Sequence, residues 1–247
     1  MKRLLTLLVP VLLALATGCA SQTLLGAEDR TKLQRDLTTG PTSVRYLKAS
    51  SYITPFFGDA SKRLLTPYPP EEVRLLNDTK GNPINPGVVQ ALVPAGSKAR
   101  ILKVEFPTAW VLAERVLYSP RTQPWVYLDV EGAPPGPPVI LVLSPQLKTK
   151  EDVLAELDRH LVEHDPAQRI VKFQARFQEA IRQKKVLESM PEAAVEMSWG
   201  APERIRRELN GQQVLQEWMY PGDKRRVYIT DGLVTRVDEG TPAAAKP

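Results

Sequence analysis

The chain of 247 residues has one cysteine, Cys19, and two histidines, His160 and His164. One thiol cannot form a disulfide within the chain, so a disulfide framework is excluded. Two histidines supply few imidazole ligands, and a zinc site would need carboxylates to complete it. The formal net charge of +5 is small for this length and does not indicate nucleic-acid binding.

Motifs of several enzyme classes are missing as well. The sequence contains no G-x-S-x-G nucleophile elbow and no glycine-rich phosphate-binding loop. After Cys19 there is no further cysteine to act as a nucleophile. We therefore predict a non-enzymatic protein with no catalytic residue, no metal and no cofactor.

The N-terminus has two basic residues, Lys2 and Arg3, followed by an apolar run over 4–16. A membrane-spanning helix needs about 20 apolar residues, so this run is too short to span a bilayer. The pattern is typical of a secretory signal peptide, which we assign to residues 1–18. Its removal lowers the formal net charge from +5 to +3, and no later apolar run is long enough to span a bilayer.

The sequence Ala-Thr-Gly-Cys at 16–19 resembles the lipobox of bacterial lipoproteins. The resemblance implies that the Cys19 thiol carries a diacylglyceryl group, that the chain is cleaved before Cys19, and that the new amine is acylated. A thiolate is a good nucleophile for such a transfer, and two or three acyl chains make a stable anchor. Ala20 and Ser21 follow, without the aspartate that retains enterobacterial lipoproteins in the inner membrane. We expect an outer-membrane anchor facing the periplasm, with the inner membrane and the cell surface as alternatives.

The next two regions differ in composition. Residues 19–44 are polar, and we expect a tether between the lipid and the folded body, although 27–37 could form a short helix. Residues 45–145 have short apolar runs and proline-rich turns. These features predict a β-rich domain, either a small antiparallel barrel or a sandwich.

Within this β-rich region, one strand alternates apolar and charged residues, which predicts that Leu102 and Val104 point into the core. Residues 110–119 and 124–130 are predicted to be two strands that flank a hairpin turn. The stretch 92–107 resembles bacterial SH3-like modules, in which a hydrophobic strand follows a P-x-G turn.

Residues 149–188 show apolar residues at helical spacing and are predicted to form a helical hairpin. Thr149 can cap the first helix, with Asp152 completing a capping box. Asp165 can cap the second helix, with Pro166 at its first position. The cations on the second helix are interpreted as a solvated face.

His160, Glu163 and His164 belong to an H-x-x-E-H string of the kind found in inverted zinc peptidases. On a helix the two histidines would share one face, and the carboxylate would poise a water. A zinc-dependent hydrolase is therefore one alternative. We favour two partly exposed histidines near a helix end, because the string is short and the helix would stop at once in Asp-Pro.

The C-terminal part begins with a short helix at 191–198, which Gly200 and Pro202 end. Four strands joined by tight turns are then predicted at 203–209, 214–220, 225–230 and 233–238. We predict that the helix stops so that a strand meander can begin beside it and cover one face. Trp199 would then pack in the corner between them.

This order resembles the small α/β module of outer-membrane assembly lipoproteins of the BamE (SmpA/OmlA) family. The matching residues are Ser189, Met190, Val195, Gly200, Pro202, Trp218 and Tyr220. The resemblance implies an αβ module over 189–239 and a role in outer-membrane assembly or maintenance. Trp218 and Tyr220 are candidate partner contacts, although we favour a core position for Trp218. Residues 240–247 are expected to be a disordered tail.

The sequence thus predicts an α+β protein with an N-terminal β region, a helical hairpin linker, and a short helix followed by an antiparallel meander. Its expected role is to bind or scaffold an envelope protein or cell-wall partner, and no nucleic acid. A zinc hydrolase and a peptidoglycan-binding module built on the SH3-like strands are the alternatives.

Overall fold

A computed structural model describes residues 23–239 as an α+β structure with two sheets. Cys19 and the predicted tail at 240–247 lie outside these residues. The helices of the described part are α2 (Ala27–Thr38), α3 (Ala109–Glu114), α4 (Lys150–Asp158), α5 (Ala167–Ile170), α6 (Ala175–Arg182) and α7 (Glu192–Trp199). Short 3-10 turns are η2 (Pro41–Ser43), η3 (Pro70–Glu72) and η4 (Pro221–Asp223). Between residues 23 and 239 no helix is long and apolar enough to cross a bilayer.

The large sheet has eight strands in the order β4-β2-β3-β7-β6-β5-β1-β8. The strands are β1 (Val44–Leu47), β2 (Ser51–Phe56), β3 (Asp59–Thr66), β4 (Ala91–Val93), β5 (Lys98–Glu105), β6 (Trp125–Val130), β7 (Val139–Val142) and β8 (Leu161–Val162). All neighbours are antiparallel except β3 and β7, which are parallel. This arrangement corrects the small N-terminal barrel or sandwich expected over 45–145, because β8 comes from beyond that range and pairs with β1.

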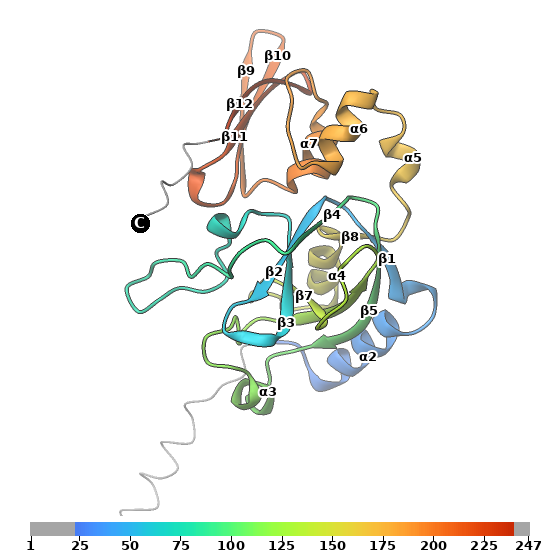
Figure 1. Cartoon of the computed structure of the whole chain (residues 1–247), viewed down its shortest axis with the longest axis vertical. Helices are drawn as coiled ribbons and strands as arrows, with labels where there is room; N and C mark the ends of the chain where they lie inside the picture. The colour runs from blue at the N-terminus through green and yellow to red at the C-terminus, as the bar shows by residue number, and fades with distance from the viewer. Residues whose placement is uncertain (1–22, 240–247) are drawn as a thin grey trace, which may run out of the picture.

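Helices α2 and α4 contribute to one core on the large sheet (Figure 1). Leu33 and Leu37 lie four residues apart on α2, so both face the sheet and are buried there. Residues 27–38 therefore differ from the polar tether expected over 19–44, because they bury two leucines against the strands. A second cluster contains Phe56, Trp125 and Ile140.

Two local predictions in the β region are wrong. A register shift between Ile101 and Lys103 forms a bulge, so Ile101 points inward and Leu102 is exposed, whereas Val104 is buried as predicted. Residues 109–114 form α3 instead of a strand, because the Thr108 hydroxyl accepts a hydrogen bond from the Val111 N–H at 3.4 Å and caps a helix.

The helical hairpin expected over 149–188 is only partly present. The capping box of Thr149 and Asp152 is confirmed at the start of α4. The Asp165 carboxylate accepts from the Ala167 N–H at 2.8 Å at the start of α5. Between these helices, however, Leu161 is fully buried and pairs with Leu47 of β1, so the chain is extended there. The predicted second helix is divided into α5 and α6.

The small sheet is an antiparallel meander in the order β12-β11-β10-β9. Its strands are β9 (Arg204–Asn210), β10 (Gln213–Met219), β11 (Arg226–Thr230) and β12 (Leu233–Asp238), which confirms the four predicted strands. One face packs against α6 and α7 in a common core. Trp199 is buried there as predicted, and its indole N–H donates to the Lys184 carbonyl at 2.9 Å.

Gly200 explains why α7 stops where it does. Its φ of 87° and ψ of 180° belong to a region that is essentially restricted to glycine. A Cβ at this position would lie 2.8 Å from the Pro67 Cβ, so the absence of a side chain also allows the turn to approach the N-terminal part closely. The helix ends at the contact between the two parts of the molecule, and the meander begins there.

Buried polar groups connect the two parts. The Arg225 guanidinium donates two hydrogen bonds to the Glu72 carboxylate, at 2.6 and 2.8 Å. The Lys184 ammonium donates to the carbonyls of Ser50 and Ser198 at 2.6 and 2.7 Å. Burial lowers the pKa of Lys184 well below its usual range. These side chains join segments that are far apart in sequence.

Candidate functional site

The two predicted partner contacts are not at the surface. Trp218 and Tyr220 are both buried in the core of the small sheet. The Trp218 indole donates to the Gln216 side chain at 3.0 Å, and the Tyr220 hydroxyl donates to the Gly200 carbonyl at 3.2 Å. The favoured core position of Trp218 is confirmed, and neither side chain is accessible to a partner.

The H-x-x-E-H string does not form the arrangement that a zinc peptidase requires. His160 lies between α4 and β8, and His164 is exposed after β8, so they do not share a helix face. Glu163 instead pairs with Arg45 at 3.0 Å. Within residues 23–239, no group of three His, Cys, Asp or Glu side chains could hold a metal ion.

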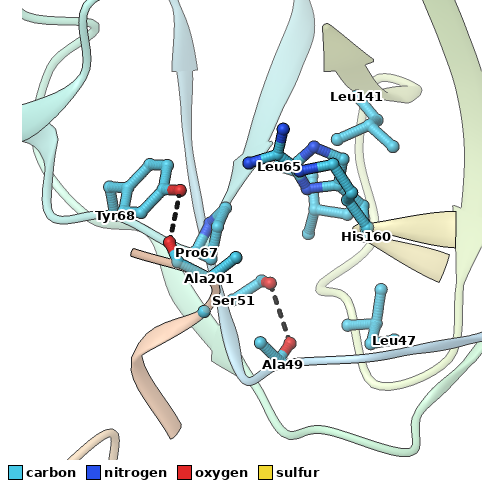
Figure 2. Close-up of a pocket in the computed structure, with 11 residues that line it drawn as sticks. Leu47, Ala49, Ser51, Leu65, Pro67, Tyr68, Leu141, His160 and Ala201 are labelled. Carbon is cyan, nitrogen blue, oxygen red and sulfur yellow. Dashed lines mark hydrogen bonds between the residues drawn. The ribbon is translucent and has the colours of Figure 1, made fainter. Parts of the chain in front are cut away.

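His160 lines a small cavity of about 20 Å³, shown in Figure 2. Around it the Tyr68 hydroxyl donates to the Ala201 carbonyl at 2.9 Å, and the Ser51 hydroxyl donates to the Ala49 carbonyl at 2.9 Å (Figure 2). A cavity of this size has room for about one water. It is therefore too small to bind a metabolite.

A wider cleft of about 480 Å³ shares Tyr68, Arg159 and His160 with this cavity. One of its three glutamates, Glu156, lies 3.7 Å from the Arg159 guanidinium and 4.0 Å from the His160 imidazole. The same carboxylate accepts from the Ser144 N–H at 3.2 Å. Burial lowers the pKa of His160 to about 4, so the imidazole is neutral at neutral pH. These polar groups connect α4 to the chain after β7.

The small sheet has one face that is open to solvent, on the side opposite α7. We call it the free face. The strand register places Arg206, Glu217, Tyr228 and Arg236 in one row across all four strands. Side chains alternate along a strand, so Glu217 faces away from the core that contains Trp218. A hollow of about 580 Å³ lies over this row.

The row is held in place by its own contacts. The Glu217 carboxylate accepts from the Arg226 guanidinium at 2.9 Å and from the Tyr228 hydroxyl at 3.3 Å. The Arg236 guanidinium lies 3.8 Å from the centre of the Tyr228 ring, in a cation–π contact. Arg206 pairs with Glu208 at 3.0 Å on the same face. The free face therefore presents an ordered aromatic ring between charged groups.

Strand β9 is the uncovered edge of the same sheet. All of its residues are exposed, and in the described chain no strand pairs with its outer side. The edge at β12 is different, because the Ser189 N–H donates to the Val234 carbonyl at 2.7 Å and the Val234 N–H donates to the Met190 carbonyl at 2.9 Å. The arginines of β9 are typical of protected edges that do not self-associate.

Sequence reasoning singled out Trp218 of β10 and Tyr220 just after it, but not the row that crosses the sheet. Counting outward from Trp218 in the predicted meander identifies Glu217 as a free-face residue. The cross-strand partners Arg206, Tyr228 and Arg236 require the register as well. No family model matches this chain, and no curated protein or solved structure matches it either.

Proposed function

We propose that this chain is a non-enzymatic lipoprotein of the bacterial envelope, anchored through Cys19 to the periplasmic leaflet of the outer membrane. It would bind another envelope component through the free face of the small sheet. The observation that carries the binding role is the row of Arg206, Glu217, Tyr228 and Arg236, which no described element covers.

The composition of the row suits recognition. Tyrosine and arginine are enriched at protein interfaces and among the residues that dominate binding energy. The Tyr228 ring is ordered by Arg236 and Glu217, so little side-chain entropy is lost on binding. With the ion-pair partners included, the charges named on the free face are three arginines and two glutamates, and this excess of cations favours a partner segment that carries carboxylates.

An envelope protein that carries carboxylates suits the charge and the aromatic ring of the free face. The resemblance of residues 189–239 to BamE-type lipoproteins supports a role in outer-membrane assembly or maintenance. The zinc hydrolase is not favoured, because His160 and His164 are separated by β8 and Glu163 is engaged by Arg45. We therefore propose a binding or scaffolding role.

Site-specific photo-crosslinking in cells tests this role. A photoreactive amino acid at position 206 or 228 of the full-length chain is expected to capture a defined envelope protein, because both positions lie on the free face. The matched control is position 151, which is exposed on α4 away from the free face. Capture should occur at the two test positions and not at the control.

A charge reversal separates specific from incidental capture. Arg236→Glu should abolish crosslinking from position 206, because it removes the cation from the Tyr228 ring and adds an anion to the row that already contains Glu217. Two results would reject the free face as the binding surface: capture of the same envelope protein from position 151, or undiminished capture from the free face in Arg236→Glu.

A further inference from the structure

Exposed apolar side chains gather around α3, in a segment that we call the α3 patch. Trp110, Leu117 and Tyr118 are 75, 63 and 66% exposed, and Val116 is 40% exposed. Large exposed apolar groups close together commonly mark a protein or membrane contact. Within the described part of the chain, most of the surface of Trp110, Leu117 and Tyr118 is left open.

The α3 patch rests on a rigid support. Arg115 is buried beneath it and donates to the carbonyls of Arg121 and Gln123 at 2.6 and 2.7 Å. Its guanidinium pairs with Glu105 at 2.8 Å and stacks 3.5 Å from the centre of the Trp125 ring. The exposed side chains are therefore presented by an ordered segment.

The position of the patch suggests what covers it. Helix α2, near the start of the described chain, and α3 both lie at the lower end of the molecule in Figure 1, whereas the small sheet lies at the upper end. Thr23 is four residues after Cys19. A chain spans at most about 3.6 Å per residue, so a lipid on Cys19 would hold Thr23 within roughly 14 Å of the bilayer surface. Leu24, the next residue, is also exposed.

We propose that the α3 patch contacts the lipid bilayer, with Trp110, Leu117 and Tyr118 inserted at the level of the headgroups. This inference rests on the proposed lipid anchor at Cys19. Tryptophan and tyrosine favour the membrane interface because their rings are apolar and each carries one polar group. The anchor and the patch together fix the orientation of the body. The small sheet at the opposite end is then directed away from the bilayer, toward a partner in the periplasm.

Tryptophan fluorescence can test this contact directly. Trp110 is the exposed member of the four tryptophans, since Trp125, Trp199 and Trp218 are buried. The full-length lipidated protein is reconstituted into vesicles of phosphatidylethanolamine and phosphatidylglycerol that carry brominated acyl chains. Emission should be quenched by the bromolipid in the wild type and not in Trp110→Phe. Quenching by aqueous acrylamide should be lost on reconstitution.

A second pair of variants separates membrane contact from anchoring. Leu117→Glu should lose bromolipid quenching while the protein still floats with the vesicles, because the acyl chains remain. Val171→Glu is the matched control, since Val171 is also exposed but follows α5 toward the other end of the molecule (Figure 1). It should keep the quenching.

The outcomes distinguish the two proposals. The protein could float with the vesicles and show acylated Cys19 in its intact mass, yet give no bromolipid quenching. This outcome would overturn the membrane contact of the α3 patch and leave the lipid anchor in place. Crosslinking of position 110 to a protein in cells, with no quenching in vesicles, would assign the patch to a protein partner instead. An unmodified Cys19 with no flotation would overturn the anchor, and the membrane contact with it.

Discussion

Among single residues, His160 shows how burial sets a response to acid. Lys48 and Arg159 lie near it and disfavour its protonated form, whereas Glu156 favours that form. Burial is the larger effect and lowers the pKa from 6.5 to about 4. As the pH falls below 6.5 the unfolded chain binds this proton before the folded chain does. Stability is therefore complete above the unfolded pKa and is lost as the pH falls toward 4.

We expect His160→Gln to flatten part of the pH dependence of stability. At about 1.4 kcal/mol per pKa unit, the wild type should lose up to about 3 kcal/mol through this residue as the pH falls from 6.5 to about 4. Urea unfolding at a series of pH values measures the difference between the two proteins. His164→Gln is the control, because His164 is exposed, and it should keep the wild-type slope. Equal slopes in all three proteins would contradict the prediction.

Among secondary-structure elements, the end of α7 depends on one glycine. Gly200 combines a backbone conformation that other residues avoid with a contact to Pro67 that excludes a Cβ. Gly211, in the turn between β9 and β10, has a φ of 62°, but a Cβ added there would meet no atom within 4 Å. An alanine at Gly211 would therefore meet backbone strain alone, whereas an alanine at Gly200 would meet backbone strain and a steric contact.

Gly200→Ala should destabilise the protein by more than the roughly 1–3 kcal/mol of backbone strain, because the new methyl group also meets Pro67. Gly211→Ala should cost only about 1 kcal/mol, the penalty for a left-handed residue in open space. Urea unfolding midpoints compare the two variants. A loss at Gly200 no larger than that at Gly211 would show that the Pro67 contact is not tight.

In the whole molecule, buried polar contacts join the large and small sheets. Glu72 and Arg225 are 153 positions apart in sequence, and both are buried. The Arg225 guanidinium also lies 4.2 Å from the centre of the Trp199 ring. Lys184 adds hydrogen bonds to carbonyls on both sides of the contact. We infer that the two parts unfold together.

Glu72→Gln should lower the free energy of unfolding by about 3–5 kcal/mol, because it leaves the Arg225 charge buried without an anion. The double variant Glu72→Gln, Arg225→Met should recover part of this loss, because it removes the unpaired charge. Glu179→Gln breaks an exposed pair with Arg182 and should cost far less than Glu72→Gln, because water screens the two charges.

Because these contacts join the two sheets, calorimetry should show one unfolding transition in the wild type. Two separate wild-type transitions would mean that the sheets unfold independently.

Much of the local structure could be predicted from the sequence. The capping box at Thr149 and the four strands after Gly200 both follow from the residues within each segment. Glycine, proline and the alternation of apolar residues act over a few positions, so these patterns determine where a strand or helix begins and ends. The core position of Trp218 follows from the same alternation.

Contacts between distant segments required the tertiary structure. Leu161 is extended because it pairs with Leu47, and α2 is helical on the sheet because Leu33 and Leu37 find apolar partners there. The row from Arg206 to Arg236 depends on the register of four strands. Such pairings are set by burial and hydrogen bonding between residues that local preferences do not relate to one another. For this reason the free face, the α3 patch and the joint between the sheets became visible only in the folded chain.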